Sequence, residues 1–368
     1  MMKLLFLIDD LVSGGAQRQM VKLSLAFREE GHQVSVLYYF PRDFYGDTLR
    51  DAGIELICLE IKNPLRRIWA FRRFIRKGNF NVVISYLGIP NFLCELAAIP
   101  YKKWRLIVNE RSANPAILRS FKSIFIRFFH LFADEVVTNS FANKKIIQKA
   151  NPFLKGKKLT VIYNMIDLDD WKPEHGFRFR KNGKITLLVP ASHRYLKNFL
   201  GLLKAISLLT EQEREKISVK WYGNNLTPPY YDDSIIECRE YIQKNNLETL
   251  VTLYPATHNI KEPIQQADII GLFSFFEGLP NVVCEGMALG KPIIASNVSD
   301  VPLLVEDNIN GKLVDPQDPE SIADGLRFFI QATESNLEEM GSKSREKTNG
   351  LLNAQIIFKQ YYRLVKNN

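Results

Sequence analysis

The sequence of 368 residues has no run of 18 apolar residues, so no part of it is expected to cross a bilayer as a helix. Its four cysteines show no Cys-x-x-Cys spacing and are too few for a disulfide framework, which favours a reducing cytoplasm. The first ten residues, MMKLLFLIDD, end in two acids without a small-residue cleavage site, which predicts a buried strand rather than a signal peptide. These absences favour a cytoplasmic protein.

Histidine is also scarce, and none of the five residues has a partner at the spacing of a metal site or a nucleophilic triad. A dinucleotide fingerprint is absent too, because Gly14 and Gly15 lack the Gly-x-Gly-x-x-Gly spacing and no acid ends the second predicted strand.

Charge is distributed unevenly along the chain. Residues 1–163 hold 26 Lys and Arg against 13 Asp and Glu, a net charge of +13, whereas the remainder holds 23 against 27, a net charge of −4. This asymmetry predicts that the first half meets an anionic partner, either nucleic acid or a membrane surface.

Short apolar runs alternate with amphipathic stretches through both halves, which is typical of βα units on parallel sheets. The predicted fold class is therefore α/β with two doubly wound domains. The predicted strands are 4–8, 34–40, 54–59, 82–86, 106–109, 135–139, 159–163, 185–189, 218–222, 251–254, 269–275, 292–296 and 312–314.

The domain boundary is predicted at residues 165–183, which are rich in Asp, Pro, Gly and Lys and show no period. The first domain then spans residues 1–164 and the second spans 184–351. A last helix is expected within 352–368, beyond a break at Gly350.

The segment FSFFEGLPNVVCEGMALGKPIIAS, residues 273–296, indicates a ligand site. A strand runs into Gly278-Leu279-Pro280, and a short helix follows, with either Leu279 or Asn281 as its cap. The N-terminal amides of that helix can stabilise a phosphate, and Glu277 and Glu285 place carboxylates on either side of it.

These residues resemble the Glu-x7-Glu motif of the family 4 retaining glycosyltransferases. The resemblance implies the GT-B architecture, in which two Rossmann-like domains face each other across a cleft and the last helix returns to the first domain. It implies that Glu285 binds the nucleotide ribose, that Glu277 approaches the donor sugar and that the loop amides meet the diphosphate. The loop residues are Gly278, Leu279, Pro280, Asn281 and Val282.

Two further loops resemble the family's donor site. Gly14 and Gly15 match the Gly-Gly-Ala loop that lies over the donor sugar and diphosphate. Lys197 matches the family's diphosphate-binding Lys, whereas Ser192 stands where the family has Arg. Arg194 is the candidate to replace it, and the alternative for both cations is a solvated surface pair.

At the end of a first-domain strand, where many members of the family have His, this chain has Glu110 and Arg111. Glu110 is a candidate to bind a sugar hydroxyl and Arg111 an acceptor phosphate. The alternative is a structural salt bridge between these neighbours.

Two segments combine basic and apolar residues. In residues 121–132 the charges fall on one helical face and the aromatic side chains on the other, and residues 65–77 carry six Lys and Arg. Either their apolar faces cover the sheet and their basic faces are solvated, or the segments dock on an anionic membrane. Nucleic acid is disfavoured, because no recognition fold is evident.

The sequence therefore predicts a retaining glycosyltransferase, a hexosyl- or N-acetylhexosaminyltransferase, that uses a lipid-linked or polysaccharide acceptor in cell-surface polysaccharide biosynthesis. It is expected to be cytoplasmic or peripheral on the inner face of the membrane. No metal or cofactor is expected beyond the donor, a UDP-sugar, because Lys197 and the helix amides can neutralise the diphosphate. The metal-like Asp167-Leu168-Asp169 lies in the predicted linker. The alternatives are a nucleotide-sugar epimerase on the same fold and a non-catalytic donor-binding subunit.

Overall fold

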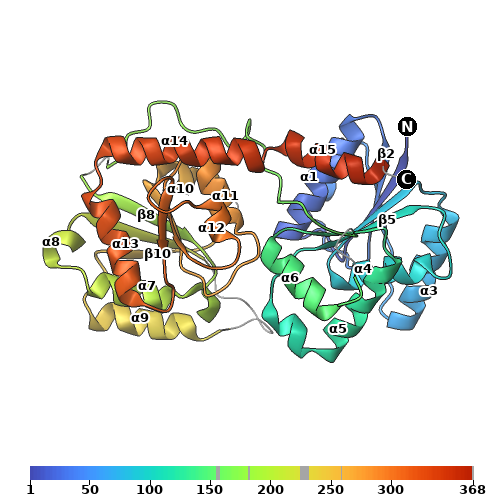
Figure 1. Ribbon diagram of the computed structural model, residues 1–368, viewed down its shortest axis with the longest axis horizontal. Coiled ribbons are helices and arrows are strands. Elements are labelled where there is room, and N and C mark those ends of the chain that lie inside the picture. Colours follow the sequence, from blue (N-terminus) through green and yellow to red (C-terminus); the bar gives the residue numbers. More distant parts are fainter. Residues whose placement is uncertain (155–157, 181–182, 224–231, 258, 367–368) are drawn as a thin grey trace. The chain divides into compact units, whose positions relative to one another are not determined.

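The computed structural model describes residues 1–154, 158–180, 183–223, 232–257 and 259–366 (Figure 1). The chain forms two compact units. Unit 1 contains Met1–Met165 and Gln355–Asn368, and unit 2 contains Ile166–Ala354. Residues 166–184, which overlap the predicted linker, belong to unit 2, where Phe179 is part of the hydrophobic core.

Within the described residues, unit 1 has a seven-stranded sheet in the order β3-β2-β1-β4-β5-β6-β7, with every neighbouring pair parallel. The strands are buried runs of β-branched and other apolar residues, as parallel sheets covered on both faces require. They are β1 Lys3–Leu7, β2 Gln33–Tyr38, β3 Glu55–Cys58, β4 Val82–Tyr86, β5 Arg105–Glu110, β6 Glu135–Thr138 and β7 Leu159–Val161.

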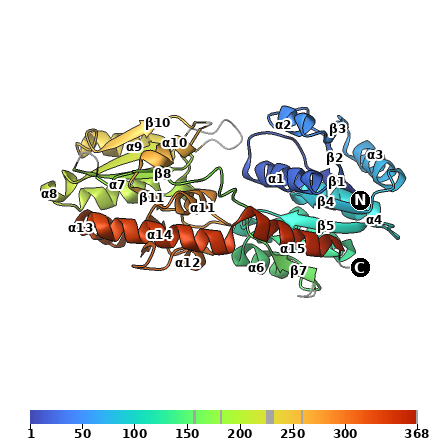
Figure 2. The ribbon, with the colours of Figure 1, turned by 90° about the horizontal axis from the view of Figure 1, so that it is seen from above.

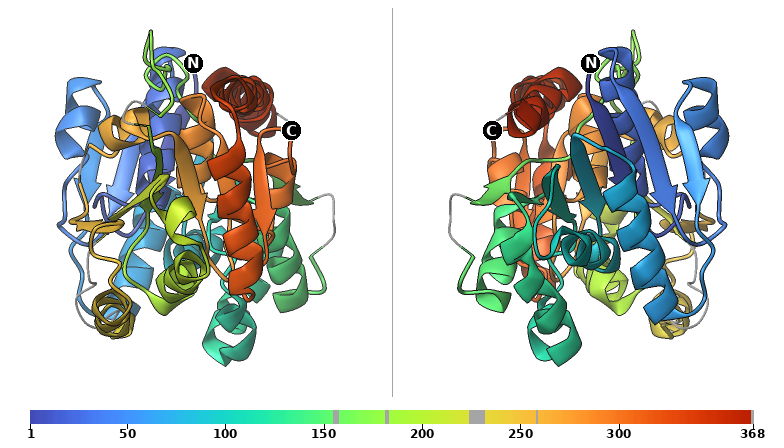
Figure 3. Two further views of the ribbon diagram at one scale, coloured as in Figure 1. Left: turned by 90° about the vertical axis from the view of Figure 1, so that its left-hand side faces the viewer. Right: turned by 90° about the vertical axis from the view of Figure 1, so that its right-hand side faces the viewer.

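Helices cover both faces of this sheet (Figures 2 and 3). Phe6 of β1 packs on Phe27 of α1, which in turn contacts Phe358 of α15, so these two helices share one face. The opposite face packs on α3, α4 and α6. The helices are α1 Gly15–Glu29, α2 Gly46–Asp51, α3 Pro64–Lys77, α4 Gly88–Ala98, α5 Phe121–Phe128, α6 Phe141–Ala150 and α15 Ala354–Lys366, with short 3₁₀ turns η1 at Pro115–Arg119 and η2 at Phe129–Phe132.

Within the described residues, unit 2 has a six-stranded parallel sheet in the order β10-β9-β8-β11-β12-β13. One face packs on α7, α9 and α13, and α11 lies on the other face, where it contacts α14. The strands are β8 Ile185–Pro190, β9 Ile217–Tyr222, β10 Val251–Tyr254, β11 Ile269–Leu272, β12 Ile293–Ser296 and β13 Gly311–Val314.

The helices of unit 2 are α7 Phe199–Ser207, α8 Glu211–Arg214, α9 Ser234–Lys244, α10 Lys261–Gln266, α11 Asn281–Ala288, α12 Val301–Leu304, α13 Pro319–Gln331 and α14 Glu334–Leu351, with a 3₁₀ turn η4 at Tyr195–Lys197. All thirteen predicted strands are present in the described residues, and their ends shift by at most three residues. The α/β prediction with two doubly wound domains is confirmed.

The break predicted at Gly350 lies one residue later, because α14 ends at Leu351 and α15 begins at Ala354. The solvated polar face predicted for residues 121–132 is only partly observed: Lys122 is exposed, but Arg127 and His130 are buried and Phe121 is 84% exposed. Among the described residues, no helix has the length and low charge that crossing a membrane requires.

Candidate functional site

The strand order of unit 2 reverses between β8 and β11, and this switch point is where ligands bind in open parallel sheets. The chain leaving β8 turns to α7 on one face of the sheet, and the chain leaving β11 turns to α11 on the other. Lys197 lies in the loop after β8 and Glu277 in the loop after β11. The fold therefore brings these two predicted site residues to the same edge.

Lys197 and Glu277 form an ion pair, with 2.6 Å between Nζ and Oε1. Their side chains are 21% and 14% exposed, so the pair is accessible from solvent but mostly shielded. The Phe275 N–H donates to the Leu196 carbonyl at 3.0 Å, and the Ser299 hydroxyl accepts from the Glu277 N–H at 3.3 Å. These bonds fix both loops, and with them the two charged groups.

Helix α11 begins at Asn281, after the short loop that follows Glu277. Its N-cap is Pro280, with no side-chain cap hydrogen bond, so the prediction of Leu279 or Asn281 as the cap is wrong. Proline suits this place because it has an extended backbone and no N–H to satisfy. The first-turn amides, including that of Val282, therefore point toward the Gly278 loop, where an anion is stabilised.

Glu285 lies in the middle of α11 and is 7% exposed. Gly286 next to it packs against β11 and β12, where an added Cβ would lie 2.7 Å from Ile270 Cγ1. This close contact sets the depth of the helix on the sheet, and with it the position of Glu285 relative to the loop.

Arg194 has a different acidic neighbour from Lys197. It lies near the Asp232 carboxylate, where burial alone would raise the pKa of Asp232 but hydrogen bonds from Ser234 and Tyr195 and the charge of Arg194 lower it. Ser192 is half-buried, and His193 is buried and stacks on Phe199. The role of Arg194 as a substitute for the family's Arg stays a prediction.

In unit 1 the strand order reverses between β1 and β4, and Gly14-Gly15 follows β1. Gly14 is the N-cap of α1, with an extended backbone. A Cβ there would lie 2.2 Å from Gln17 Oε1, and Gln17 Nε2 donates to Asp10 Oδ1 at 2.8 Å. Glycine at position 14 thus lets α1 fold back on the end of β1.

The two acids that follow β1, Asp9 and Asp10, were missed as functional candidates. Asp10 is 2% exposed and forms an ion pair with Arg42 at 2.5 Å. Burial, followed by the charge of Asp10, raises the pKa of Asp9 to about 6. Asp9 is half-buried at the sheet edge beside the Gly14 loop, so it can exchange a proton near neutral pH. The sequence signal was the pair of acids at the carboxyl end of an apolar strand.

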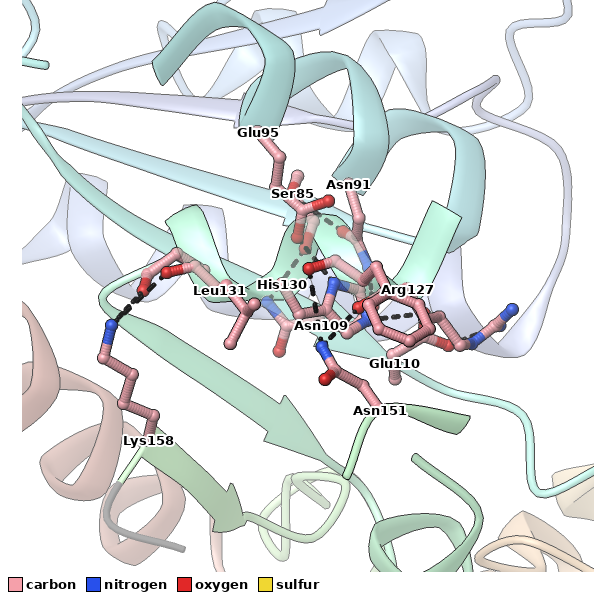
Figure 4. A network of polar contacts seen from close by, with 12 residues as sticks. Ser85, Asn91, Glu95, Asn109, Glu110, Arg127, His130, Leu131, Asn151 and Lys158 are labelled. Atoms are coloured by element: carbon pink, nitrogen blue, oxygen red, sulfur yellow. Dashed lines mark hydrogen bonds and ion pairs between the residues drawn. The ribbon is translucent and has the colours of Figure 1, made fainter. Parts of the chain in front are cut away.

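Glu110 at the end of β5 lies inside unit 1, in the polar network of Figure 4. Its Oε2 accepts from Arg127 Nη2 at 2.9 Å, and its Oε1 lies 3.2 Å from His130 Nε2. His130 Nδ1 lies 2.5 Å from Oε1 of Glu95 on α4. Both carboxylate oxygens of Glu110 are therefore engaged, which argues against its direct contact with substrate.

Burial alone would lower the pKa of His130, but the charges and hydrogen bonds of Glu95 and Glu110 outweigh it and raise the pKa to about 9. Burial likewise opposes ionisation of Glu110, yet its bonds to His130 and Arg127 lower its pKa overall. Burial raises the pKa of Glu95. His130 is therefore a cation at neutral pH and joins α4, β5 and η2 electrostatically.

Arg111 does not pair with Glu110, so the alternative of a salt bridge between these neighbours is wrong. Arg111 donates to Asn109 Oδ1 at 3.0 Å and to Asn164 Oδ1 at 3.1 Å, and it also bonds the Tyr361 hydroxyl of α15. It is half-buried, and its guanidinium lies 5.1 Å from the centre of the Tyr86 ring. Arg111 thus ties the end of β5 to the chain that leaves unit 1.

Among the described residues, no group of three His, Cys, Asp or Glu side chains is arranged to hold a metal ion. Asp167 instead accepts hydrogen bonds from the N–H groups of Asp169 and Asp170 at 2.9 and 3.2 Å, which stabilises a turn.

Comparison with known structures shows the fold. Anabaena HepE in complex with UDP superposes with a TM-score of 0.83 at 18% identity, over 98% of this chain and 99% of that one. In sequence, a Campylobacter jejuni α-1,4-N-acetyl-D-galactosaminyltransferase, named for the acceptor GalNAc-GalNAc-diNAcBac-PP-undecaprenol, is 26% identical over 90% of this chain and 89% of its own length. A second C. jejuni N-acetylgalactosaminyltransferase is 23% identical over 90% and 91%.

The family model described as Glycosyltransferase Family 4 matches residues 13–170, and the model described as Glycosyl transferases group 1 matches residues 172–347. The first match lies mostly in unit 1 and the second lies in unit 2, so both units have counterparts in one kind of enzyme. With its two doubly wound domains of the GT-B fold, the chain belongs to the family 4 glycosyltransferases.

Proposed function

We propose that this protein is a retaining, metal-independent glycosyltransferase that moves a sugar from a UDP-sugar to a lipid-linked glycan or polysaccharide. The observation that carries the proposal is the Lys197–Glu277 ion pair at the switch point of unit 2, beside the N-terminus of α11.

The pair suits a ligand that brings an anion and hydroxyl groups together. When a diphosphate arrives, the Lys197 ammonium and the α11 amides stabilise its charge, and the Glu277 carboxylate is released to accept hydrogen bonds from sugar hydroxyls. Glu285, about one turn beyond the first residue of α11, is assigned to the ribose hydroxyls. This arrangement neutralises the leaving group with protein charges alone.

The reaction balances without an external base. The bond between the anomeric carbon and the diphosphate oxygen breaks, and the acceptor oxygen bonds to the same face of that carbon. The acceptor proton passes to the leaving diphosphate oxygen. Between the breaking of the first bond and the formation of the second, positive charge develops on the sugar, and Glu277 stabilises it.

The relatives support the choice of substrates. HepE was crystallised with UDP, and the names of both C. jejuni relatives describe transfer of N-acetylgalactosamine to glycans on undecaprenol diphosphate. We therefore propose an N-acetylhexosaminyl donor and a lipid-linked acceptor in cell-surface glycan synthesis for this chain.

Unit 1 also carries a surface suited to an anionic membrane. Helix α4 contacts both α3 and α5. On α3, Trp69 is 71% exposed next to the exposed Arg66 and Arg73, and on α5 Phe121 is 84% exposed and stacks on Phe125. Exposed aromatic side chains beside cations fit an interfacial site, so a peripheral position on a membrane is part of the proposal.

Calorimetric titration with UDP tests the donor assignment. Wild type and the control Glu334→Gln, an exposed residue of α14, should bind UDP equally, and Glu285→Gln should bind it at least about tenfold more weakly, because a charge-assisted hydrogen bond contributes about 1.5–3 kcal/mol. Equal affinity for all three proteins would remove Glu285 from the site.

A second assay separates the proposal from its rivals. Purified protein is incubated with UDP-N-acetylgalactosamine or UDP-N-acetylglucosamine, with and without an undecaprenol-diphosphate-linked trisaccharide. A mass increase of one sugar on the acceptor supports the transferase. An altered donor sugar without acceptor would indicate an epimerase, and UDP binding without turnover would indicate a donor-binding subunit.

A further inference from the structure

A preformed pocket lies beside the Lys197–Glu277 pair, on the face of unit 2 that carries α7 and α9. Its volume is about 590 Å³, within the usual range of small-molecule sites, and its lining is mostly apolar. We propose that this pocket binds an uncharged saccharide, as a glycan subsite separate from the nucleotide site. The inference rests on the proposed function in that it assigns a glycan acceptor to the chain.

The wall of the pocket that favours a sugar is aromatic. Tyr195 is 68% exposed, and its ring lies 5.3 Å from that of Phe275, which also lines the pocket. The faces of aromatic rings carry partial negative charge, and the axial C–H groups of a pyranose ring carry partial positive charge, so a sugar stacks on such a platform.

Hydrogen bonds hold the pocket open without a ligand. Asp232 accepts from the N–H groups of Tyr195 and Ser234 at 2.7 and 2.9 Å, which fixes the Tyr195 loop to the start of α9. On the other side, Asn198 Nδ2 donates to the Pro316 carbonyl at 2.7 Å and joins the loops after β8 and β13. A rigid pocket loses little entropy when a ligand binds.

Charge argues against an anionic ligand. The described residues that line the pocket include one cation, Lys204, and one carboxylate, Glu237. On the other side of Tyr195 lies a second hollow of about 540 Å³, lined by Asp232, Asp233, Glu237 and Glu240. Four carboxylates repel a phosphate or a nucleotide but accept hydrogen bonds from sugar hydroxyls.

The pocket is lined by residues that adjoin the proposed donor site in the chain. Tyr195 and Leu196 precede Lys197 directly, Phe275 and Phe276 precede Glu277, and the Phe275 N–H donates to the Leu196 carbonyl. A saccharide that occupies the pocket therefore lies against the same two loops that carry the ion pair. The ligand expected there is a neutral oligosaccharide, as found at the glycan end of an acceptor or product.

Saturation-transfer NMR on the full chain, without any nucleotide, tests the inference. The probes are maltotriose, triacetylchitotriose and α1,4-linked tri-N-acetylgalactosamine, with UDP and trilysine as charged probes. At least one neutral sugar should bind. Tyr195→Ala should weaken the binding of that sugar about tenfold, because one aromatic stacking contact is lost. Tyr195→Phe keeps the ring and should bind as wild type does, as should the control Tyr101→Ala, whose target residue in unit 1 is 62% exposed.

Three outcomes would overturn the inference: no neutral sugar binds, Tyr195→Ala binds as wild type does, or Tyr195→Ala loses only UDP or trilysine. The assay contains no donor sugar, so it is independent of turnover. A protein that binds sugar through Tyr195 but transfers none would keep the subsite and contradict the proposed function. If the protein transfers sugar but its Tyr195→Ala variant keeps full sugar affinity, the proposed function stands and the Tyr195 subsite is contradicted.

Discussion

Arg127 Nη2 lies 2.9 Å from Glu110 Oε2, and both side chains are more than nine-tenths buried. A buried pair of this kind is costly to break, because removing one partner leaves the other charge with fewer bonded counter-ions in a medium of low polarity. The pair joins α5 to the end of β5, and it explains why Arg127 lies inward while Phe121 and Phe125 lie outward.

Arg127→Leu should lower the free energy of unfolding by about 3 kcal/mol, because Glu110 Oε2 would lose its buried donor, while His130 would remain bonded to the other carboxylate oxygen. Urea denaturation followed by circular dichroism measures this. Lys122→Leu, on the exposed side of the same helix, is the control and should change stability by no more than about 0.5 kcal/mol. If Arg127→Leu is as stable as the control, the buried pair does not hold α5 in place.

The stability of unit 1 should fall as the pH rises from about 6.5 to above 9. The folded state raises the pKa of His130 to about 9, whereas the unfolded chain has the ordinary value of about 6.5. The stabilisation is therefore complete below the lower value and is lost as the pH passes through the higher one. The measurement is urea denaturation at several pH values for wild type and His130→Gln.

Only the difference between these two proteins is diagnostic. Burial lowers the pKa of Lys291 in unit 2 to about 7. Its contribution to the pH dependence therefore has the opposite sign, because the folded protein gains stability as the pH rises and Lys291 loses its proton. Lys291 is present in both proteins and cancels in the difference. Parallel stability curves for wild type and His130→Gln across this range would contradict the raised pKa.

The sequence was sufficient to predict the architecture, because each strand is a short apolar run between turn residues. The strand Val82–Tyr86 was predicted with its observed bounds. The loop Gly278–Pro280 was recognised by the same local signals. Local patterns suffice where neighbours along the chain determine the structure.

Partners distant in sequence could not be predicted. The neighbours Glu110 and Arg111 looked like a pair, but Glu110 bonds Arg127 and His130, and Arg111 bonds Tyr361, 250 residues later. The helical period of residues 121–132 revealed two faces but not which face is buried. That choice depends on Glu95 and Glu110, which only the fold brings beside α5.

Lys197→Ala should reduce turnover about 100- to 1000-fold, the usual cost of deleting one preorganised charge-stabilising donor. Steady-state transfer assays at saturating donor measure the change in kcat. Lys343→Ala removes a 49% exposed lysine of α14 and should leave kcat unchanged. A Lys197→Ala variant with full turnover would show that the leaving diphosphate is stabilised elsewhere.

Unit 1 should bind anionic vesicles through α3 and α5. Co-sedimentation with phosphatidylglycerol vesicles should be weakened about tenfold or more by Arg66→Gln with Arg73→Gln, since each cation near the surface contributes about 1 kcal/mol. The same charge dependence predicts weaker binding at high salt. Phe121→Ser with Phe125→Ser should weaken it by removing apolar contact.

Phe44→Ser is the matched control for the aromatic change, since Phe44 is 54% exposed and lies before α2, away from α3 and α5 in the chain. Its binding should equal that of wild type. If all variants sediment with the vesicles to the same extent, or wild type does not sediment at all, the proposal that α3 and α5 bind an anionic membrane is wrong.

The configuration of the new glycosidic bond tests the central claim most directly. The product formed from an α-linked UDP-sugar, in the presence of EDTA, is examined by proton NMR at its anomeric position. The Lys197–Glu277 account predicts transfer at full rate and an α-linked product, because metal is not needed and the acceptor attacks the face from which the diphosphate leaves. A β-linked product, or transfer that stops with EDTA and resumes with magnesium or manganese, would contradict it.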